Sequence, residues 1–166
     1  MGFKKILFLN GHGGNQLPVN TALQQLKLSR PNLLAMGCEY WKVAAKAISK
    51  LRESEFGGMG HGGELETSLC LYLAPDRVRT DRIADGGRMS DSFWFQNEMQ
   101  LAAPVAAVAD FEEITKNGVF GKATLATAEK GRLFFEAIVD ELERFVLTVE
   151  VMKSPWPFSH KHEVKA

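Results

Sequence analysis

The chain has 166 residues, of which 45% are hydrophobic and 24% charged, a composition typical of an ordinary globular domain with a sizeable core. Its 20 basic residues balance its 20 acidic residues, so no net field attracts nucleic acid or an anionic membrane, and we expect neither partner. No apolar run approaches the roughly 20 residues that a membrane span needs, and the N-terminus lacks the pattern of a signal peptide. We therefore expect a cytoplasmic protein.

The N-terminal stretch predicts a buried strand followed by a ligand-binding loop. Residues 6–9 form a short apolar run, and the turn after it places His12 among Gly11, Gly13 and Gly14. Glycines give the backbone conformations that are closed to other residues, and histidine supplies metal or acid–base chemistry. Since ligands of open α/β sheets bind at the carboxyl ends of the strands, we expect this loop to belong to a site.

The rest of the chain predicts an α/β fold. Apolar spacing predicts a second buried strand over 32–38, which a right-handed crossover sets parallel to the first. The predicted helices cover 19–28, with Asn20 or Thr21 as N-cap, then 41–52, 64–73 and 123–151. We expect a loop over 56–63, an excursion over 78–99, a strand or buried helical turn over 101–109, and turns at 117–118 and 120–121. We expect one domain over 1–152, a flexible tail over 153–166, and two buried free thiols, Cys38 and Cys70.

A second glycine–histidine loop, GHGGELETS at 60–68, repeats the arrangement around His12. The imidazoles of His12 and His61 and the carboxylates of Glu64 and Glu66 form a ligand set suited to zinc, manganese or iron. Such a metal lowers the pKa of a bound water to about 7, which suits attack on an amide carbon. Glu64 and Glu66 are two residues apart at a helix start, so they point to different sides.

Each of these residues also has a purely structural interpretation. A histidine in a glycine-rich turn can be a hydrogen-bonded loop residue, Glu66 can cap the helix, and Glu64 can be a solvated first-turn acid. The glycine loops also suit a phosphate cradle, although no Walker lysine or G-x-G-x-x-G follows them.

Three motifs occur in order along most of the chain: NGHGGN at 10–15, GHGGELETSL at 60–69 followed by LAPDRV, and GVFGKATLATAEKG at 118–131. Together they resemble the creatininase (creatinine amidohydrolase) family. The resemblance implies a three-layer αβα fold with a largely parallel sheet, and homo-oligomers that are hexamers in relatives. It also implies hydrolysis of the C–N bond of a small amide, cyclic amide or formamide, or of a peptide bond, with one or two divalent metal ions (zinc, manganese or iron).

The resemblance also assigns roles to individual residues. It implies that His12 is a metal ligand, that His61 transfers protons, and that Glu66 lies at the metal centre with a catalytic role. It implies a substrate-binding surface formed by Gly13, Gly14, Asn15 and Gly62.

Two departures from the family pattern alter these expectations. Gly13 and Gly14 stand where creatininase has bulkier residues, including a metal-binding glutamate, so we expect a substrate other than creatinine. The N-terminal segment that supplies Glu, His and Asp ligands in the family has no counterpart here. We therefore expect a domain that is incomplete at its N-terminus, and the alternative function is an inactive scaffold that keeps the fold for oligomerisation or ligand binding.

Overall fold

The computed structural model describes residues 2–88, 90–96, 98–100 and 102–153, so the predicted tail, apart from residue 153, lies outside the described residues. The chain divides into two compact units, Met1–Val43 with Glu141–Ala166, and Ala44–Asp140. Helix α6 (Ala128–Val151) contributes residues to both units. None of the described helices has the length and apolarity to cross a membrane. The prediction of a single domain over 1–152 stays a prediction.

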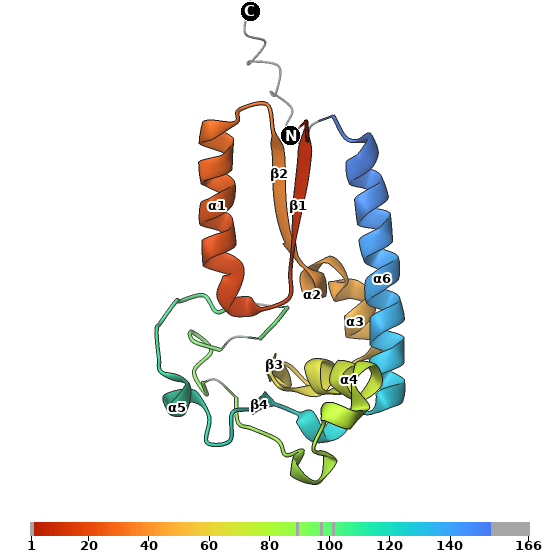
Figure 1. Ribbon diagram of the computed structural model, residues 1–166. Helices are drawn as coiled ribbons and strands as arrows, with labels where there is room; N and C mark the ends of the chain where they lie inside the picture. The colour runs from red at the N-terminus through yellow and green to blue at the C-terminus, as the bar shows by residue number, and fades with distance from the viewer. Residues whose placement is uncertain (1, 89, 97, 101, 154–166) are drawn as a thin grey trace, which may run out of the picture. The chain divides into compact units, whose positions relative to one another are not determined.

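The first unit is an α/β arrangement around a parallel strand pair. Its elements are β1 (Lys5–Asn10), the 3-10 helix η1 (Gly13–Asn15), α1 (Gln16–Ser29), β2 (Leu34–Glu39), α2 (Tyr40–Val43) and the end of α6. β1 pairs with β2 in parallel, in a register that runs from Lys5 opposite Leu34 to Asn10 opposite Glu39. Figure 1 shows the two strands between α1 and the C-terminal half of α6. This is the predicted αβα layering, and the predicted parallel pairing of the two strands is confirmed.

Close packing and a long side chain fix the two helices against these strands. Gly37 in β2 lets α1 approach, since a Cβ there would lie 2.9 Å from Cγ1 of Val19. On the other side, Nζ of Lys5 donates hydrogen bonds to the carbonyl oxygens of Val149 and Glu150, at 2.9 and 2.6 Å. These are carbonyls of the last turn of α6, where the Val149 oxygen also accepts the backbone N–H of Met152 at 3.3 Å, so the lysine completes the end of that helix.

The second unit contains α3 (Ala45–Leu51), β3 (Met59–His61), α4 (Glu64–Leu73), α5 (Phe111–Ile114), β4 (Phe120–Gly121), the start of α6, and the 3-10 helices η2 (Pro75–Arg77), η3 (Thr80–Arg82) and η4 (Ala123–Leu125). β3 pairs with β4 in antiparallel fashion. Its buried apolar side chains are those of Ala44, Ile48, Met59, Leu65, Ala123, Phe134 and Ile138. The core of this unit therefore joins α3, β3, α4 and the first half of α6.

A carboxylate lies inside this core. Glu64, the first residue of α4, is fully buried, and it accepts hydrogen bonds from the backbone N–H groups of Glu53 (2.9 Å) and Ser54 (2.8 Å). Nζ of Lys130 lies 2.9 Å from Oε1 of Glu64 and 3.0 Å from Oε1 of Glu53. Burial alone would raise the pKa of Glu64, but hydrogen bonds from Ser54, Glu53 and Lys130 outweigh it and lower the pKa. Glu64 thus joins the loop after α3, the start of α4 and the start of α6.

A second buried ion pair holds a distant segment against the same loop. The guanidinium of Arg52 binds both oxygens of Glu98, at 2.8 and 3.1 Å, and Oε2 of Glu98 also accepts the backbone N–H of Gly57 at 2.8 Å. Nε of Arg52 donates to the carbonyl oxygen of Ser54. A bidentate, charged contact of this kind has a defined geometry, so it fixes residues 98–100, which have no regular secondary structure.

Several of the predicted helices, strands and loops differ from the structure. The helix predicted over 41–52 is interrupted at Ala44, and the predicted loop over 56–63 and turn at 120–121 contain the paired strands β3 and β4. The helix predicted from residue 123 begins at Ala128 after a 3-10 turn, and residues 102–109 contain neither the predicted strand nor a helical turn. Helix α1 begins at Gln16, so Asn20 and Thr21 lie inside it and neither is the N-cap.

Other element predictions hold or need only a shift of their ends. The predicted helix over 64–73 is confirmed, and the second strand is shifted by one or two residues to Leu34–Glu39. The prediction that both strands are buried is wrong, because Leu9 in β1 is 56% exposed and every residue of β2 is half-buried or exposed. Cys38 and Cys70 are free thiols as predicted, but Cys70 is exposed and Cys38 is only half-buried. The prediction that both thiols are buried is therefore wrong.

We predict that Glu64→Gln destabilises the protein by about 3–5 kcal/mol, the usual cost of breaking a buried ion pair. The amide cannot present an acceptor to both backbone N–H donors. Because the folded-state pKa of Glu64 lies below its unfolded value, its contribution is present above the unfolded pKa, near about 4.3, and is lost as the pH falls through the folded pKa. Urea unfolding at a series of pH values should therefore show a shallower acid decline for this variant. Glu112→Gln, at an exposed position, is the matched control, and equal stability of the two variants would contradict the prediction.

We predict that Gly131→Ala destabilises the protein although alanine is the better helix former. The propensity gain is about 1 kcal/mol, but the new Cβ would lie 1.9 Å from the carbonyl oxygen of Ser68 in α4, so the two helices must separate. Overpacking of this kind typically destabilises the folded state by about 1–3 kcal/mol, which exceeds the gain in helix propensity over most of that range. Gly87→Ala is the control, since a Cβ at Gly87 meets nothing within 4 Å. An unchanged or raised denaturation midpoint for Gly131→Ala would show that α4 and α6 do not cross here.

Candidate functional site

The His12 loop is held by the asparagine that ends β1. Asn10 is 5% exposed, and its Nδ2 donates to the carbonyl oxygen of His12 at 2.9 Å while its Oδ1 accepts the His12 backbone N–H at 3.1 Å. The backbone N–H of Asn15 also donates to the His12 carbonyl, at 3.0 Å. Asn10 was not among the predicted site residues, although an Asn-Gly pair after a strand is a known signal for a side chain that closes a turn.

The imidazole of His12 is exposed and lies over the next turn of the chain. A Cβ on Gly14 would lie 2.9 Å from Nε2 of His12, at the end of a side chain that can move aside, whereas Gly11 and Gly13 face open space. Gly11, Gly13 and Gly14 are not among the glycines with positive φ, so the prediction that they adopt conformations closed to other residues is wrong. Within the described part of the chain, the imidazole makes no hydrogen bond, which leaves its nitrogens available to a ligand.

The second loop is organised by the first turn of α4. Gly62 has φ +60°, a left-handed conformation that favours glycine, and its N–H donates to Oε2 of Glu66 at 2.7 Å. Oγ1 of Thr67 donates to the Gly62 carbonyl at 2.8 Å. Glu66 therefore does what the capping interpretation predicts, because it receives a backbone N–H just before the helix. Oε2 of Glu66 is engaged in this way, whereas Oε1 has no hydrogen-bonding partner among the residues that the structure describes.

His61 ends β3, and its ring contacts two aromatic side chains that also contact each other. The ring centroid of Phe111 lies 4.9 Å away at an interplanar angle of 80°, and that of Phe120 lies 5.8 Å away at 28°. The side chain is half-buried, and none of the described residues accepts or donates a hydrogen bond at its ring nitrogens. An imidazole held by ring contacts alone keeps both nitrogens free for proton transfer or ligation.

Glu64 does not belong to this set. Its carboxylate is occupied by Glu53, Ser54 and Lys130, and it is not the solvated first-turn acid of the structural interpretation. Its side chain and that of Glu66 point to different sides of α4, as their spacing predicts.

The described residues do not by themselves form a metal site. Over the described ranges, no group of three or more His, Cys, Asp and Glu side chains is placed to hold a metal ion. His12, Gly13, Gly14 and Asn15 belong to the first unit, while His61, Gly62 and Glu66 belong to the second. The joint site of the two loops therefore stays a prediction, and the contacts within each loop are the observed part of it.

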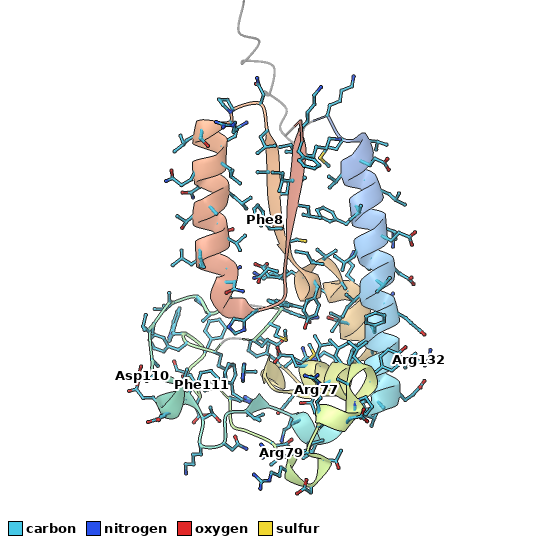
Figure 2. The ribbon with its side chains drawn as sticks, in the orientation of Figure 1. Phe8, Arg77, Arg79, Asp110, Phe111 and Arg132 are labelled. Carbon is cyan, nitrogen blue, oxygen red and sulfur yellow. The ribbon has the colours of Figure 1, made fainter. Side chains whose placement is uncertain are left out.

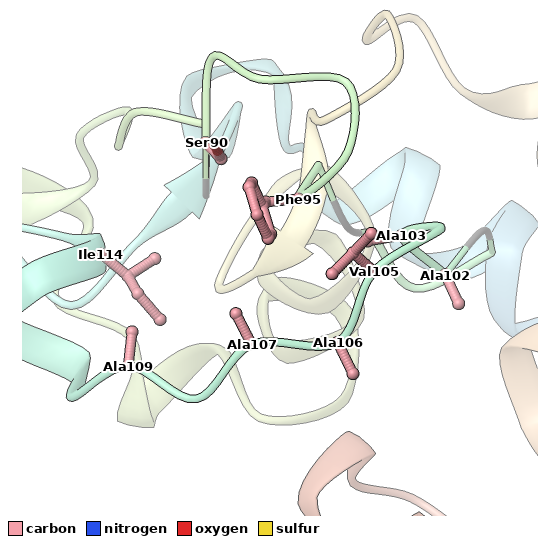
Figure 3. A pocket seen from close by; sticks show the side chains of 9 residues that line it. All are labelled: Ser90, Phe95, Ala102, Ala103, Val105, Ala106, Ala107, Ala109 and Ile114. Atoms are coloured by element: carbon pink, nitrogen blue, oxygen red, sulfur yellow. The ribbon is translucent and has the colours of Figure 1, made fainter.

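A pocket of about 360 Å³ lies mainly along residues 102–109, and two residues of the predicted excursion over 78–99 also line it (Figure 3). It is lined by Ser90, Phe95, Ala102, Ala103, Val105, Ala106, Ala107, Ala109 and Ile114. None of the predicted site residues is among these lining residues. The pocket is apolar and has one hydroxyl group, so it offers no acid–base chemistry.

Comparison with known proteins gives a consistent result. A peptidase of the mycofactocin precursor peptide from Mycobacterium ulcerans (strain Agy99) is 31% identical over 144 residues, which are 82% of this chain and 46% of the relative. A 3-dehydro-scyllo-inosose hydrolase of Thermotoga maritima is 28% identical over 87% of this chain and 50% of its own. A creatinine amidohydrolase of Pseudomonas putida is 31% identical over 51% of this chain and 36% of its own. The chain thus spans about half the length, or less, of the curated relatives that it matches.

Solved structures agree with the sequence relatives. A Bacteroides fragilis NCTC 9343 protein assigned as a creatinine amidohydrolase superposes with a TM-score of 0.73 at 27% identity, covering 93% of this chain and 57% of that one. A structure described as "Creatininase Mn" has a TM-score of 0.66 at 25% identity, over 88% of this chain and 56% of that one. A mutant creatininase of "Zn-Zn type" gives the same TM-score and identity, over 89% and 57%.

The sequence model of the family described as "Creatininase: Creatinine amidohydrolase" matches residues 1–146. That range contains both glycine–histidine loops, the buried Glu64 and most of α6. With the α/β fold and the structural matches, this establishes that the chain belongs to the creatininase family.

Proposed function

We propose that this chain is the part of a metal-dependent amidohydrolase of creatininase type that carries the two glycine–histidine loops. The reaction is hydrolysis of a C–N bond in a small amide, cyclic amide or formamide. The observation that carries the proposal is the family match over residues 1–146, together with relatives named as a peptide peptidase and a creatinine amidohydrolase. Both names refer to substrates with amide-type C–N bonds.

His61 is the proton-transferring residue in this proposal. Its support is an imidazole that ring contacts hold while both nitrogens stay free of hydrogen bonds within the described residues. Hydrolysis needs a proton delivered to the leaving nitrogen, and histidine does this near neutral pH. Glu66 acts in part by fixing Gly62 directly after His61, and its second oxygen is available to the reaction. Gly13, Gly14, Asn15 and Gly62 would form the backbone surface around the substrate.

A divalent metal, zinc, manganese or iron, is part of the proposal, with His12 as the ligand that this chain offers. Its support is the free imidazole of His12 and the manganese and zinc forms of the related creatininase structures. The described residues do not fit a complete metal site, because they contain no three-residue ligand group. A homo-oligomer in the cytoplasm, acting on a small-molecule amide, completes the proposal.

One observation favours a second function. Because the described residues contain no three-ligand group, the chain could instead be an inactive scaffold that keeps the family fold for assembly or ligand binding. The two functions differ in a measurable way, since only the first requires metal-dependent turnover.

The test is metal binding followed by turnover, in the full chain freed of metal with a chelator. Titration with Zn²⁺ and Mn²⁺ should show binding in the parent and at least about a tenfold loss of affinity in His12→Ala. Loss of a residue that only hydrogen-bonds a metal ligand already costs about 10–100-fold in metal affinity, and loss of the ligand itself should cost no less. The metal-loaded parent should hydrolyse at least one member of a panel of cyclic amides, formamides and short peptides. His61→Gln should reduce kcat by about 10²–10⁴-fold, the usual contribution of acid–base catalysis.

His160→Ala, which removes another of the four histidines, is the matched control and should leave metal affinity and turnover unchanged. Equal metal affinity in the parent and His12→Ala would refute the assignment of His12. Metal binding without turnover of any member of the panel would favour the scaffold.

A further inference from the structure

The ring of His61 has no hydrogen-bonding partner among the described residues, yet two aromatic rings from later in the chain face it. We infer that Phe111 and Phe120 form an aromatic clamp that orients the His61 imidazole, so that both are positioning residues. This inference rests on the proposed function for its catalytic meaning, although the clamp itself can be tested without any activity.

The geometry is that of specific aromatic contacts. The His61 ring meets Phe111 edge to face and Phe120 nearly face to face, and the centroids of Phe111 and Phe120 are 5.9 Å apart. All three separations lie within the range of about 4.5–7 Å in which aromatic rings prefer defined orientations. The three rings contact one another pairwise, so rotation of the imidazole about its χ angles would disturb two contacts at once.

The antiparallel pair β3–β4 places Phe120 opposite His61. The two residues are partners in the register of that pair. Gly60 makes room for the ring, because a Cβ on Gly60 would lie 2.1 Å from Cδ2 of Phe120. Gly60 is not among the glycines with positive φ, so its backbone conformation does not require glycine. The close approach of the Phe120 ring gives a physical reason for glycine at this position.

Phe111 reaches His61 from the short helix α5, where Figure 2 labels it beside Asp110. The backbone N–H of Asp110 donates to Oε2 of Glu113 at 2.7 Å, and the Glu113 N–H donates to the Asp110 carbonyl at 3.0 Å. Beyond the helix, Oγ1 of Thr115 donates to the carbonyl oxygen of Val119, next to Phe120. These bonds fix α5 against the start of β4, so Phe111 and Phe120 are held as one unit.

The clamp also explains why the imidazole keeps its chemistry. A histidine oriented by a carboxylate or a carbonyl has one nitrogen occupied, whereas ring contacts occupy neither. Phe111 is 46% exposed and His61 is half-buried, so the pair lies at the surface of this unit. Orientation without loss of either nitrogen suits a residue that both accepts and delivers a proton.

The test follows the His61 ring by NMR in the full chain, with His61→Gln used to assign its ring-proton signals. Ring currents from Phe111 act on these protons, so Phe111→Ala and Phe111→Leu should shift them, and Phe111→Tyr, which restores a ring, should return them close to the parent position. Phe93→Ala is the matched control, because Phe93 is 68% exposed and contacts Trp94 instead. It should leave the His61 signals in place.

Unchanged His61 signals in Phe111→Ala would overturn the clamp. Loss of the folded amide spectrum in both Phe111→Ala and Phe111→Leu would also overturn it, because Phe111 would then be needed for the folding of the second unit and not only for the orientation of His61. Where the parent hydrolyses an amide, Phe111→Leu should lower kcat and leave KM unchanged, and an unchanged kcat would refute the positioning role. A parent without turnover bears on the proposed function alone, because the NMR result stands apart from it.

Discussion

The second unit depends on a charge that is fully removed from water. Glu64 can remain ionised there only because two backbone N–H groups and Lys130 surround its carboxylate. Burial alone would lower the pKa of Lys130, but the hydrogen bonds to Glu64 and Glu53 outweigh it and raise the pKa, so both partners stay charged near neutrality. Removing either Glu64 or Lys130 leaves the other charge buried without a partner, which is strongly destabilising. The positions of these groups are therefore closely constrained. The loop after α3, the start of α4 and the start of α6 are thereby held in one arrangement.

That arrangement carries the His61 loop. α4 begins at Glu64, and two residues later Glu66 fixes Gly62, so the same helical turn has one carboxylate in the core and one at the loop. The backbone of the loop is held by hydrogen bonds, while the imidazole of His61 packs against the rings of Phe111 and Phe120. Within the described part of the chain, the ring nitrogens of His61 have no hydrogen-bonding partner, although the backbone next to it is fixed by polar contacts. His12 follows the same rule, since Asn10 binds its backbone and leaves its ring unbound.

The sequence predicted what local patterns determine. Helix α4 was predicted with its observed ends because its boundaries are local: glycines precede it, and Ala74-Pro75 terminates it. Strands β3 and β4 were missed because their glycines, Gly60 and Gly121, read as loop signals, whereas each is needed for close approach to a partner distant in sequence. Glu64 contacts Lys130, which lies 66 positions later in the chain, and His61 contacts Phe111, which lies 50 positions later. No periodicity in the sequence indicates contacts of this kind. The motifs identified the family, but the support of each motif residue is non-local.

Amide hydrogen exchange of Glu53 and Ser54 tests most directly whether the buried carboxylate of Glu64 organises this unit. These two N–H groups are exposed to exchange only if the carboxylate is not where the structure has it. At neutral pH we expect both amides to exchange only through global unfolding, and to lose protection in Lys130→Met together with the N–H of Gly62, which depends on the same helical turn. Rapid exchange of the Ser54 amide in the parent protein, at rates typical of an unprotected loop, would contradict the account.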